Sequence, residues 1–144
     1  MAFKPITFLA NIKRIFAAAT GLTTIAYWGY PGITVSSYDL PAVFIELVDP
    51  SLGSQSTSIP DKEYRLHVRF VLYAETTAID DYFAAVIVAI RANPQLLDTD
   101  GKKTCEYFGS QEGNKITFSI VSTEVVGKQT IHGIHIDVPC RIRD

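Results

Sequence analysis

The chain contains few cysteines, and they are not arranged as a metal site. Cys105 and Cys140 are the two cysteines in 144 residues, and they form neither a CxxC pair nor another zinc-like spacing. A disulfide would require the fold to bring them together. We therefore interpret them as reduced thiols of a cytosolic protein, where disulfides are rare.

Neither sign of charge dominates the sequence. Thirteen Lys and Arg stand against 15 Asp and Glu, which gives a formal net charge of −2. A dedicated nucleic-acid binder usually carries a basic excess, because much of its affinity comes from neutralising phosphates. The charge therefore argues against a protein that grips DNA, but it is compatible with one that encloses DNA.

Long apolar runs are missing as well. No segment approaches the roughly 20 apolar residues that span a bilayer. In the N-terminal stretch MAFKPITFLANIKRIFAAATG the apolar residues are interrupted by Asn11, Lys13 and Arg14. This pattern predicts an amphipathic helix and not a signal peptide, and we expect no membrane partner.

Motifs of catalysis and cofactor binding are also absent from the sequence. There is no P-loop, GxGxxG, GxSxG or HExxH pattern. His67 lies on the polar side of an expected strand, and His132 and His135 would point to opposite faces of another, which is unsuitable for a shared metal. We predict no catalytic residues, no cofactor and no metal.

What is present indicates one ordinary globular domain. Hydrophobic residues make up 47% and charged residues 19%, and we find no repeat or linker, so residues 1–144 are expected to form a single domain. Apolar spacing predicts a first helix over residues 5–20, with Pro5 in its first turn and Gly21 beyond its end. Its expected buried stripe is Ile6, Leu9, Ile12, Ile15, Phe16 and Ala19.

An aromatic stretch and two strands are expected next. Residues 24–29 predict a short strand and residues 30–33 a turn; Tyr27, Trp28 and Tyr30 either pack over the sheet edge or form an exposed contact patch. The nearly all-apolar AVFIELV at 42–48 predicts a strand covered on both faces. The polar segment 51–60, SLGSQSTSIP, predicts a flexible hairpin tip or arm.

The clearest strand is expected at residues 62–74. Its sequence KEYRLHVRFVLYA alternates, which indicates one buried face and one face toward solvent or a partner. The predicted core face carries Tyr64, Leu66, Val68, Phe70 and Leu72. The other face carries Glu63, Arg65, His67, Arg69 and Tyr73, with Val71 as the exception.

A second helix is predicted from Thr77 to the Asn93-Pro94 stop. Thr77 with Asp80 matches a capping box, and Asp80 and Asp81 suit the positive end of the helix dipole. The expected buried stripe is Ile79, Phe83, Val86, Ile87 and Ile90.

The last part predicts a short strand at 104–108 and a hairpin with arms at 115–126 and 130–143. A three-residue turn through Gln129 would set Ile120 opposite Ile136 and Phe118 opposite Val138, with all apolar side chains on one face. A bulge near Gly133 would have the same effect on the faces. The order of elements predicts an α+β fold: a mixed, mainly antiparallel sheet with two helices packed on one face and a C-terminal β-hairpin.

Basic residues gather on the predicted non-core face. Arg65, Arg69, Arg141 and Arg143 would form a small positive stripe with Tyr73 if the two long strands are neighbours. The stripe is either a solvated sheet face or a subunit contact, since Arg and Tyr are over-represented at interfaces.

The whole pattern resembles the tail terminator and tail-completion proteins of long-tailed bacteriophages, the class of the lambda-type minor tail protein U. The resemblance is carried by the amphipathic first helix, PAVFIEL with its polar loop, EYRLHVRFVLYA, a helix ending in Asn-Pro, and the closing GIHIDVPCRI. It covers nearly the whole chain in element order and length, although no diagnostic motif defines the class.

The resemblance implies a structural subunit of a ring, usually a hexamer. Such a ring caps the tail tube, ends its polymerisation, meets a head-completion or connector protein, and lets DNA pass through its lumen without specific binding. The subunit would be made in the host cytoplasm and reside in the virion tail or neck. Residues Ser54, Gln55 and Ser56 and the last hairpin would contact the ring or tube by position.

Two other functions stay open from the sequence. One is a head-closure, connector or other neck protein of the same virion. The other is a small α+β enzyme or ligand-binding module, which would need a deep polar pocket near His67 or His135.

Overall fold

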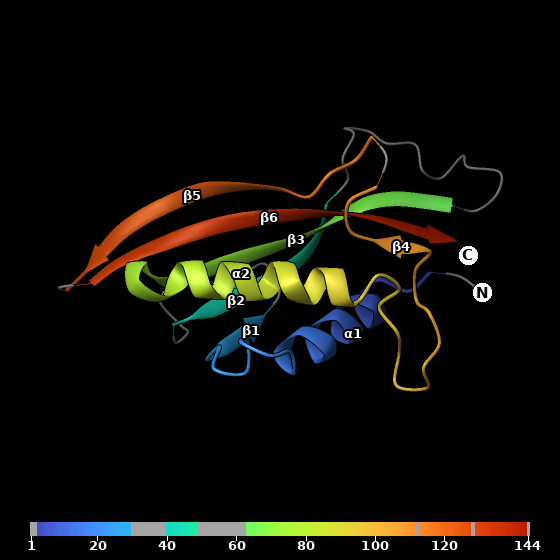
Figure 1. The fold of residues 1–144 in the computed structure, drawn as a ribbon, viewed down its shortest axis with the longest axis horizontal. Coiled ribbons are helices and arrows are strands. Elements are labelled where there is room, and N and C mark those ends of the chain that lie inside the picture. The colour runs from blue at the N-terminus through green and yellow to red at the C-terminus, as the bar shows by residue number, and fades with distance from the viewer. Residues whose placement is uncertain (1–2, 30–39, 49–62, 112, 128, 144) are drawn as a thin grey trace.

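A computed structural model describes residues 3–29, 40–48, 63–111, 113–127 and 129–143. The predicted turn at 30–33 and the polar segment 51–60 lie outside the described residues. Within the described part the chain forms a helix, two strands, a long strand, a second helix and three further strands (Figure 1). Their bounds are α1 Pro5–Ala17, β1 Tyr27–Gly29, β2 Ala42–Val48, β3 Glu63–Glu75, α2 Thr76–Ala92, β4 Tyr107–Phe108, β5 Thr117–Val126 and β6 Gln129–Arg143.

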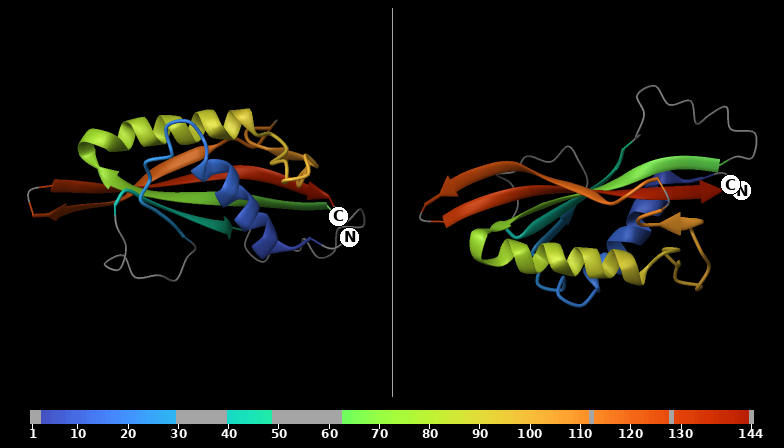
Figure 2. Two further views of the ribbon diagram at one scale, coloured as in Figure 1. Left: turned by 90° about the horizontal axis from the view of Figure 1, so that it is seen from below. Right: turned by 45° about the horizontal axis from the view of Figure 1, so that its top comes forward.

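The described strands form one mixed sheet in the order β1-β2-β3-β6-β4, with β5 also paired to β6. Only the β1–β2 pair is parallel among the described pairs. Strand β6 pairs with β3 along its length on one edge, and with β5 and then β4 on the other. Both helices lie on one side of the sheet (Figure 2), so the predicted α+β fold is confirmed.

The core lies between the helices and one face of the sheet, which we call the helix face. Alternate side chains of β2, β3 and β6 point into it, because successive residues of a strand point to opposite faces. Phe16 of α1 packs on Phe70 of β3 and on Phe108 of β4, with ring centroids 4.8 Å and 6.2 Å apart. All three rings are at most 1% exposed, so they join the first helix to the central strand β3 and to the edge strand β4.

The first helix is shorter than predicted and rotated. It ends at Ala17, and its buried residues are Phe8, Leu9, Ile12 and Phe16. Ile6, which we expected in the stripe, is 75% exposed. Phe8 takes its place because the helix lies with a different stripe against the sheet, which the spacing of the apolar residues alone did not determine.

The aromatic stretch packs and is not an exposed patch, as far as it is described. Strand β1 is limited to Tyr27–Gly29 within the predicted 24–29. The Tyr27 ring lies against Phe44, with centroids 5.7 Å apart, and Trp28 packs against the main core. Strand β2 has the predicted bounds, and its first four residues are buried on both faces.

The predicted capping box of α2 is wrong. The helix begins at Thr76, directly after β3, with Glu75 as the flanking residue and no side-chain cap hydrogen bond. No acidic residue lies in the first turn, so Asp80 and Asp81 are further along than expected. The start of α2 is instead fixed by Thr76, whose hydroxyl donates to the Thr130 carbonyl at 3.2 Å. The end at Asn93 is as predicted.

The hairpin has a different register from the predicted one. Only two residues separate Val126 from its partner Gln129, so the three-residue turn is wrong. A bulge between Ile120 and Ser122, opposite Gly133, then sets Ile120 opposite Ile134 and Phe118 opposite Ile136. The apolar side chains of the two strands still share one face, as the bulge near Gly133 predicts.

Candidate subunit-contact face

The face of the sheet opposite the helices, here called the second face, holds the residues that the sequence singled out. Arg65, Arg69 and Tyr73 of β3 share it by strand alternation, and the β3–β6 register adds Arg141 directly opposite Arg65. The side chain of Arg143 and residues Ser54, Gln55 and Ser56 lie outside the described part. The second face is therefore formed by the predicted strands, with the predicted orientation.

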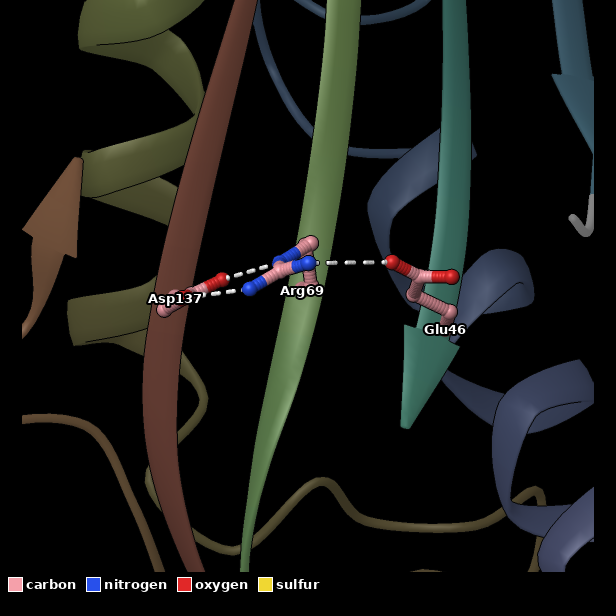
Figure 3. Close-up of polar contacts among 3 residues, drawn as sticks. All are labelled: Glu46, Arg69 and Asp137. Carbon is pink, nitrogen blue, oxygen red and sulfur yellow. Dashed lines mark hydrogen bonds and ion pairs between the residues drawn. The ribbon is translucent and has the colours of Figure 1, made fainter. Parts of the chain in front are cut away.

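An ion network occupies the middle of the second face (Figure 3). Arg69 donates from Nε to Asp137 Oδ1 at 2.7 Å and from Nη2 to Oδ2 at 3.1 Å. Its Nη1 lies 3.5 Å from Glu46 Oε1. The arrangement follows from register, because Glu46, Arg69 and Asp137 are direct neighbours across β2, β3 and β6.

The network differs from an ordinary surface ion pair. The side chains of Arg69, Asp137 and Glu46 are between 22% and 28% exposed, so water screens their attraction less than at an open surface. The two-point contact with Asp137 also fixes the planar guanidinium. The hydrogen bond to Asp137 is the main cause that raises the pKa of Arg69. The positive charge of Arg69 is thus compensated by the two neighbouring carboxylates, so Arg69 does not contribute to a positive stripe.

An apolar cluster continues the second face toward the end of β3. Ala42, Phe44 and Val71 are buried there, and the Tyr73 ring meets Phe44 edge-on with centroids 6.1 Å apart. Burial, and secondarily the charge of Glu124, raises the pKa of the Tyr73 hydroxyl. Tyr73 is therefore part of a packed cluster four residues away from Arg69 along β3.

Gly133 lies beneath the Tyr73 ring, directly opposite in the β3–β6 register. A Cβ at this position would come within 2.7 Å of Tyr73 Cε1 and 2.5 Å of Ser122 Oγ. A larger residue here would force the Tyr73 ring or the Ser122 hydroxyl to move, because both side chains close over the strand. The bulge in β5 and the packing of Tyr73 thus depend on the same residue.

The histidines take separate places. His135 is on the second face, where burial first and Arg69 second lower its pKa. His132 is on the helix face, with Nε2 2.8 Å from the Thr76 hydroxyl and Nδ1 3.2 Å from the Thr123 hydroxyl. The prediction that His132 and His135 point to opposite faces is confirmed. In the described residues, no three His, Cys, Asp or Glu side chains gather as a metal site.

The cysteines are close together in the fold. Both thiols are buried and not joined by a disulfide. A hydrogen bond with Cys105, followed by burial, raises the pKa of Cys140 well above its ordinary value. The two sulfur atoms are therefore neighbours inside the core, between the 93–106 connection and β6.

Sequence reasoning missed Glu46 and Asp137 as parts of this face. The sequence did mark both residues, since each is a charged residue among the apolar residues of its strand. It could be used only with the pairing of three strands known, because each carboxylate is recognised by what lies across from it.

The chain matches no protein-family model, and no curated protein matches it. Neither helix in the described residues has the length and apolar character that crossing a membrane takes.

Proposed function

We propose that this chain is a structural protein of a bacteriophage tail, and that its ring caps the tail tube, ends tube polymerisation and offers the surface for head docking. One observation carries the proposal. The β5–β6 hairpin extends past the start of α2 in all three views, as an arm beyond the helix layer (Figures 1 and 2). A two-stranded hairpin is marginally stable alone, so an arm of this kind is suited to packing on another subunit.

The second face supports a contact role. The guanidinium of Arg69 is held by two carboxylates, so this part of the face is a preformed polar surface and not an anion site. Preorganised polar groups at an interface give specificity at a low cost in ordering. A contact role of the second face is consistent with a tail terminator. The proposal of a phage tail itself rests on the resemblance in element order to that class.

The proposed ring has a protein partner on each side and DNA in its lumen. The tail tube protein and a head-completion or connector protein would bind opposite sides of the ring, which we propose to be a hexamer. The net charge of −2 suits a lumen through which DNA slides without specific binding. The ring would reside in the tail or neck of the virion.

Tube capping can be tested directly with purified components. Tube protein is polymerised with and without this chain, and tube lengths and tube ends are examined by negative-stain electron microscopy. We expect shorter tubes with a ring at one end. Tubes of unchanged length without rings would overturn the proposal.

A second experiment distinguishes tail capping from head closure. The chain is added to unfinished tails and to unfilled heads, and binding is measured by co-sedimentation. Binding of the chain to unfinished tails supports a tail terminator. Binding to heads alone would replace it with a head-closure or connector protein of the same virion.

A further inference from the structure

Strand β5 exposes an apolar stripe that the helices do not cover. Phe118, Ile120 and Val125, which we call the β5 stripe, are 63%, 66% and 71% exposed. They lie on the helix face, because their partners across the hairpin are Ile136, Ile134 and Thr130. Phe83 of α2 meets Phe118 edge-on with centroids 5.0 Å apart, which leaves the stripe beyond Phe118 uncovered.

The outer edge of β5 has few of the protections usual for an edge strand. Within the described residues β5 pairs with β6 alone, so its other edge presents main-chain N–H and C=O groups. Its ten residues, TFSIVSTEVV, include one charge and no Pro, Lys or Arg. Edge strands of monomers are usually short, charged or interrupted by Pro, and apart from its bulge this strand is not. The edge therefore favours a partner.

The exposed area is of the size that a subunit contact uses. The three side chains of the stripe present on the order of 400 Å² of apolar surface. A stable interface buries about 800 Å² on each partner. The strand edge and the charged residues around the stripe can provide the rest.

Charge distinguishes the hairpin end of the molecule from the opposite end. Described acidic residues stand where β3 ends, α2 begins and β5 ends; they are Glu75, Asp80, Asp81 and Glu124. Described basic residues stand where α1 and β3 begin and where α2 and β6 end; they are Lys4, Arg65, Arg91 and Arg141. The acids Asp98, Asp100 and Glu106 offset part of the basic end.

The basic end also exposes apolar side chains. Ile6 at the start of α1 is 75% exposed, Leu97 after α2 is 46% exposed and Tyr107 of β4 is 37% exposed. The start of α1, the connection after α2 and β4 all lie at the end opposite the hairpin (Figure 1). Each end thus combines apolar contact surface with charge of opposite sign, which makes the two ends of one chain complementary.

We propose that the hairpin end of one copy, with the β5 stripe, docks on the basic end of a second copy around Ile6, Leu97 and Tyr107. The inference rests on the proposed function and specifies the subunit contact of its ring. The two surfaces differ, so the contact is head-to-tail and repeats from copy to copy until it closes. A two-fold dimer would need one self-complementary surface instead.

The test uses charge placed on the stripe. Ile120→Lys puts a strongly hydrated cation on the edge strand, and Val88→Lys puts the same charge at a 63% exposed site on α2 outside both surfaces. Assembly is measured by size-exclusion chromatography with light scattering, and folding by circular dichroism. We expect the concentration for half-assembly to rise at least about tenfold for Ile120→Lys and to stay near wild type for Val88→Lys.

A mixing experiment tests the direction of the contact. Ile6→Asp blocks the basic end and leaves the stripe intact, whereas Ile120→Lys does the reverse. Each variant alone should be a monomer. An equimolar mixture should give a heterodimer, because one intact pair of surfaces remains. A mixture that stays monomeric would overturn the head-to-tail contact.

The outcomes separate this inference from the proposed function. If the wild type forms an oligomer that Ile120→Lys does not weaken, the β5 stripe is not the subunit contact, and the proposed ring is unaffected. An oligomer that Ile120→Lys dissolves, but that does not cap tubes, would sink the phage function and leave the contact standing. A wild-type monomer at high concentration would overturn both.

Discussion

At the scale of single residues, Arg69 is the best-defined group on the second face. It lies between two carboxylates that would repel each other without it, because Glu46 and Asp137 are its neighbours on either side. Removing one partner of a partly buried ion network costs more than the network contributes, since the remaining charges stay in place without compensation. The role of Arg69 is therefore to hold β2, β3 and β6 in register.

Replacing Arg69 by Met should lower the free energy of unfolding by about 1–2 kcal/mol, because Asp137 loses two charge-assisted hydrogen bonds. Urea unfolding measures this. Lys115→Met, which removes an exposed cation, should change stability by less than about 0.5 kcal/mol.

A double-mutant cycle between Arg69→Met and Asp137→Asn isolates the pair. The double variant should be more stable than the sum of the single effects predicts, because each single change already breaks the contact. Additive effects would show that the two side chains are not coupled.

His135 gives a pH dependence with a definite sign. Its pKa is lowered in the folded chain by burial and by Arg69, so the unfolded chain binds its proton first. Stability should be complete above the ordinary pKa of about 6.5 and should fall as pH decreases below it, toward the folded pKa. The groups around it, Asp137 and Glu46, act in the opposite direction and limit the effect.

The measurement is the free energy of unfolding between about pH 5 and pH 8. His135→Gln should reduce the slope in this window. An unchanged slope would place the proton uptake elsewhere, and His67→Gln provides the comparison on the same face.

At the scale of elements, the start of α2 shows a competition between two neighbouring threonines. The pattern Thr77-x-x-Asp80 predicts a local cap. The structure instead uses Thr76, which contacts Thr130 and His132 of β6. Contacts to a distant strand are invisible to a rule that considers four consecutive residues, so sequence alone selected the wrong threonine.

The matched pair Thr76→Val and Thr77→Val tests this assignment. Thr76→Val should cost about 1 kcal/mol of unfolding free energy through its lost hydrogen bonds, and Thr77→Val less than about 0.5 kcal/mol. Thermal unfolding followed by circular dichroism ranks the two. The reverse order would restore the capping box.

The hairpin shows which part of a strand pairing can be predicted. Alternation correctly placed Phe118, Ile120 and Ile136 on one face. It left two registers open, a three-residue turn or a bulge near Gly133, and the structure has the bulge, in β5 opposite Gly133, where Tyr73 and Ser122 approach from two different strands. The face to which a side chain points can be predicted from one strand, whereas the register depends on contacts among several strands.

At the scale of the whole molecule, one core connects all the layers. The described core cluster contains residues of both helices and of β2, β3, β4 and β6. The sequence predicted this α+β arrangement because long periodic segments determine it. It did not predict the ion network or the neighbouring thiols, since both arise where segments distant in sequence meet.

Phe16→Ala and Phe118→Ala form a matched pair for this core. Phe16 is fully buried and Phe118 is 63% exposed. Phe16→Ala should cost about 3–5 kcal/mol and Phe118→Ala less than about 1 kcal/mol of unfolding free energy. Calorimetry should show a single cooperative transition in the wild type, and two resolved transitions would contradict the single-domain prediction.

Strand β6 also bears on how the molecule responds to force. It is paired with β3 continuously from Ile131 to Arg143, and β5 and β4 join its other edge in succession. A pull on the hairpin directed along β6 would load the whole ladder in shear, so many hydrogen bonds would have to break together. A pull across the strands would open them one at a time from the turn. The molecule should therefore be mechanically stiff along its long axis and weak across it.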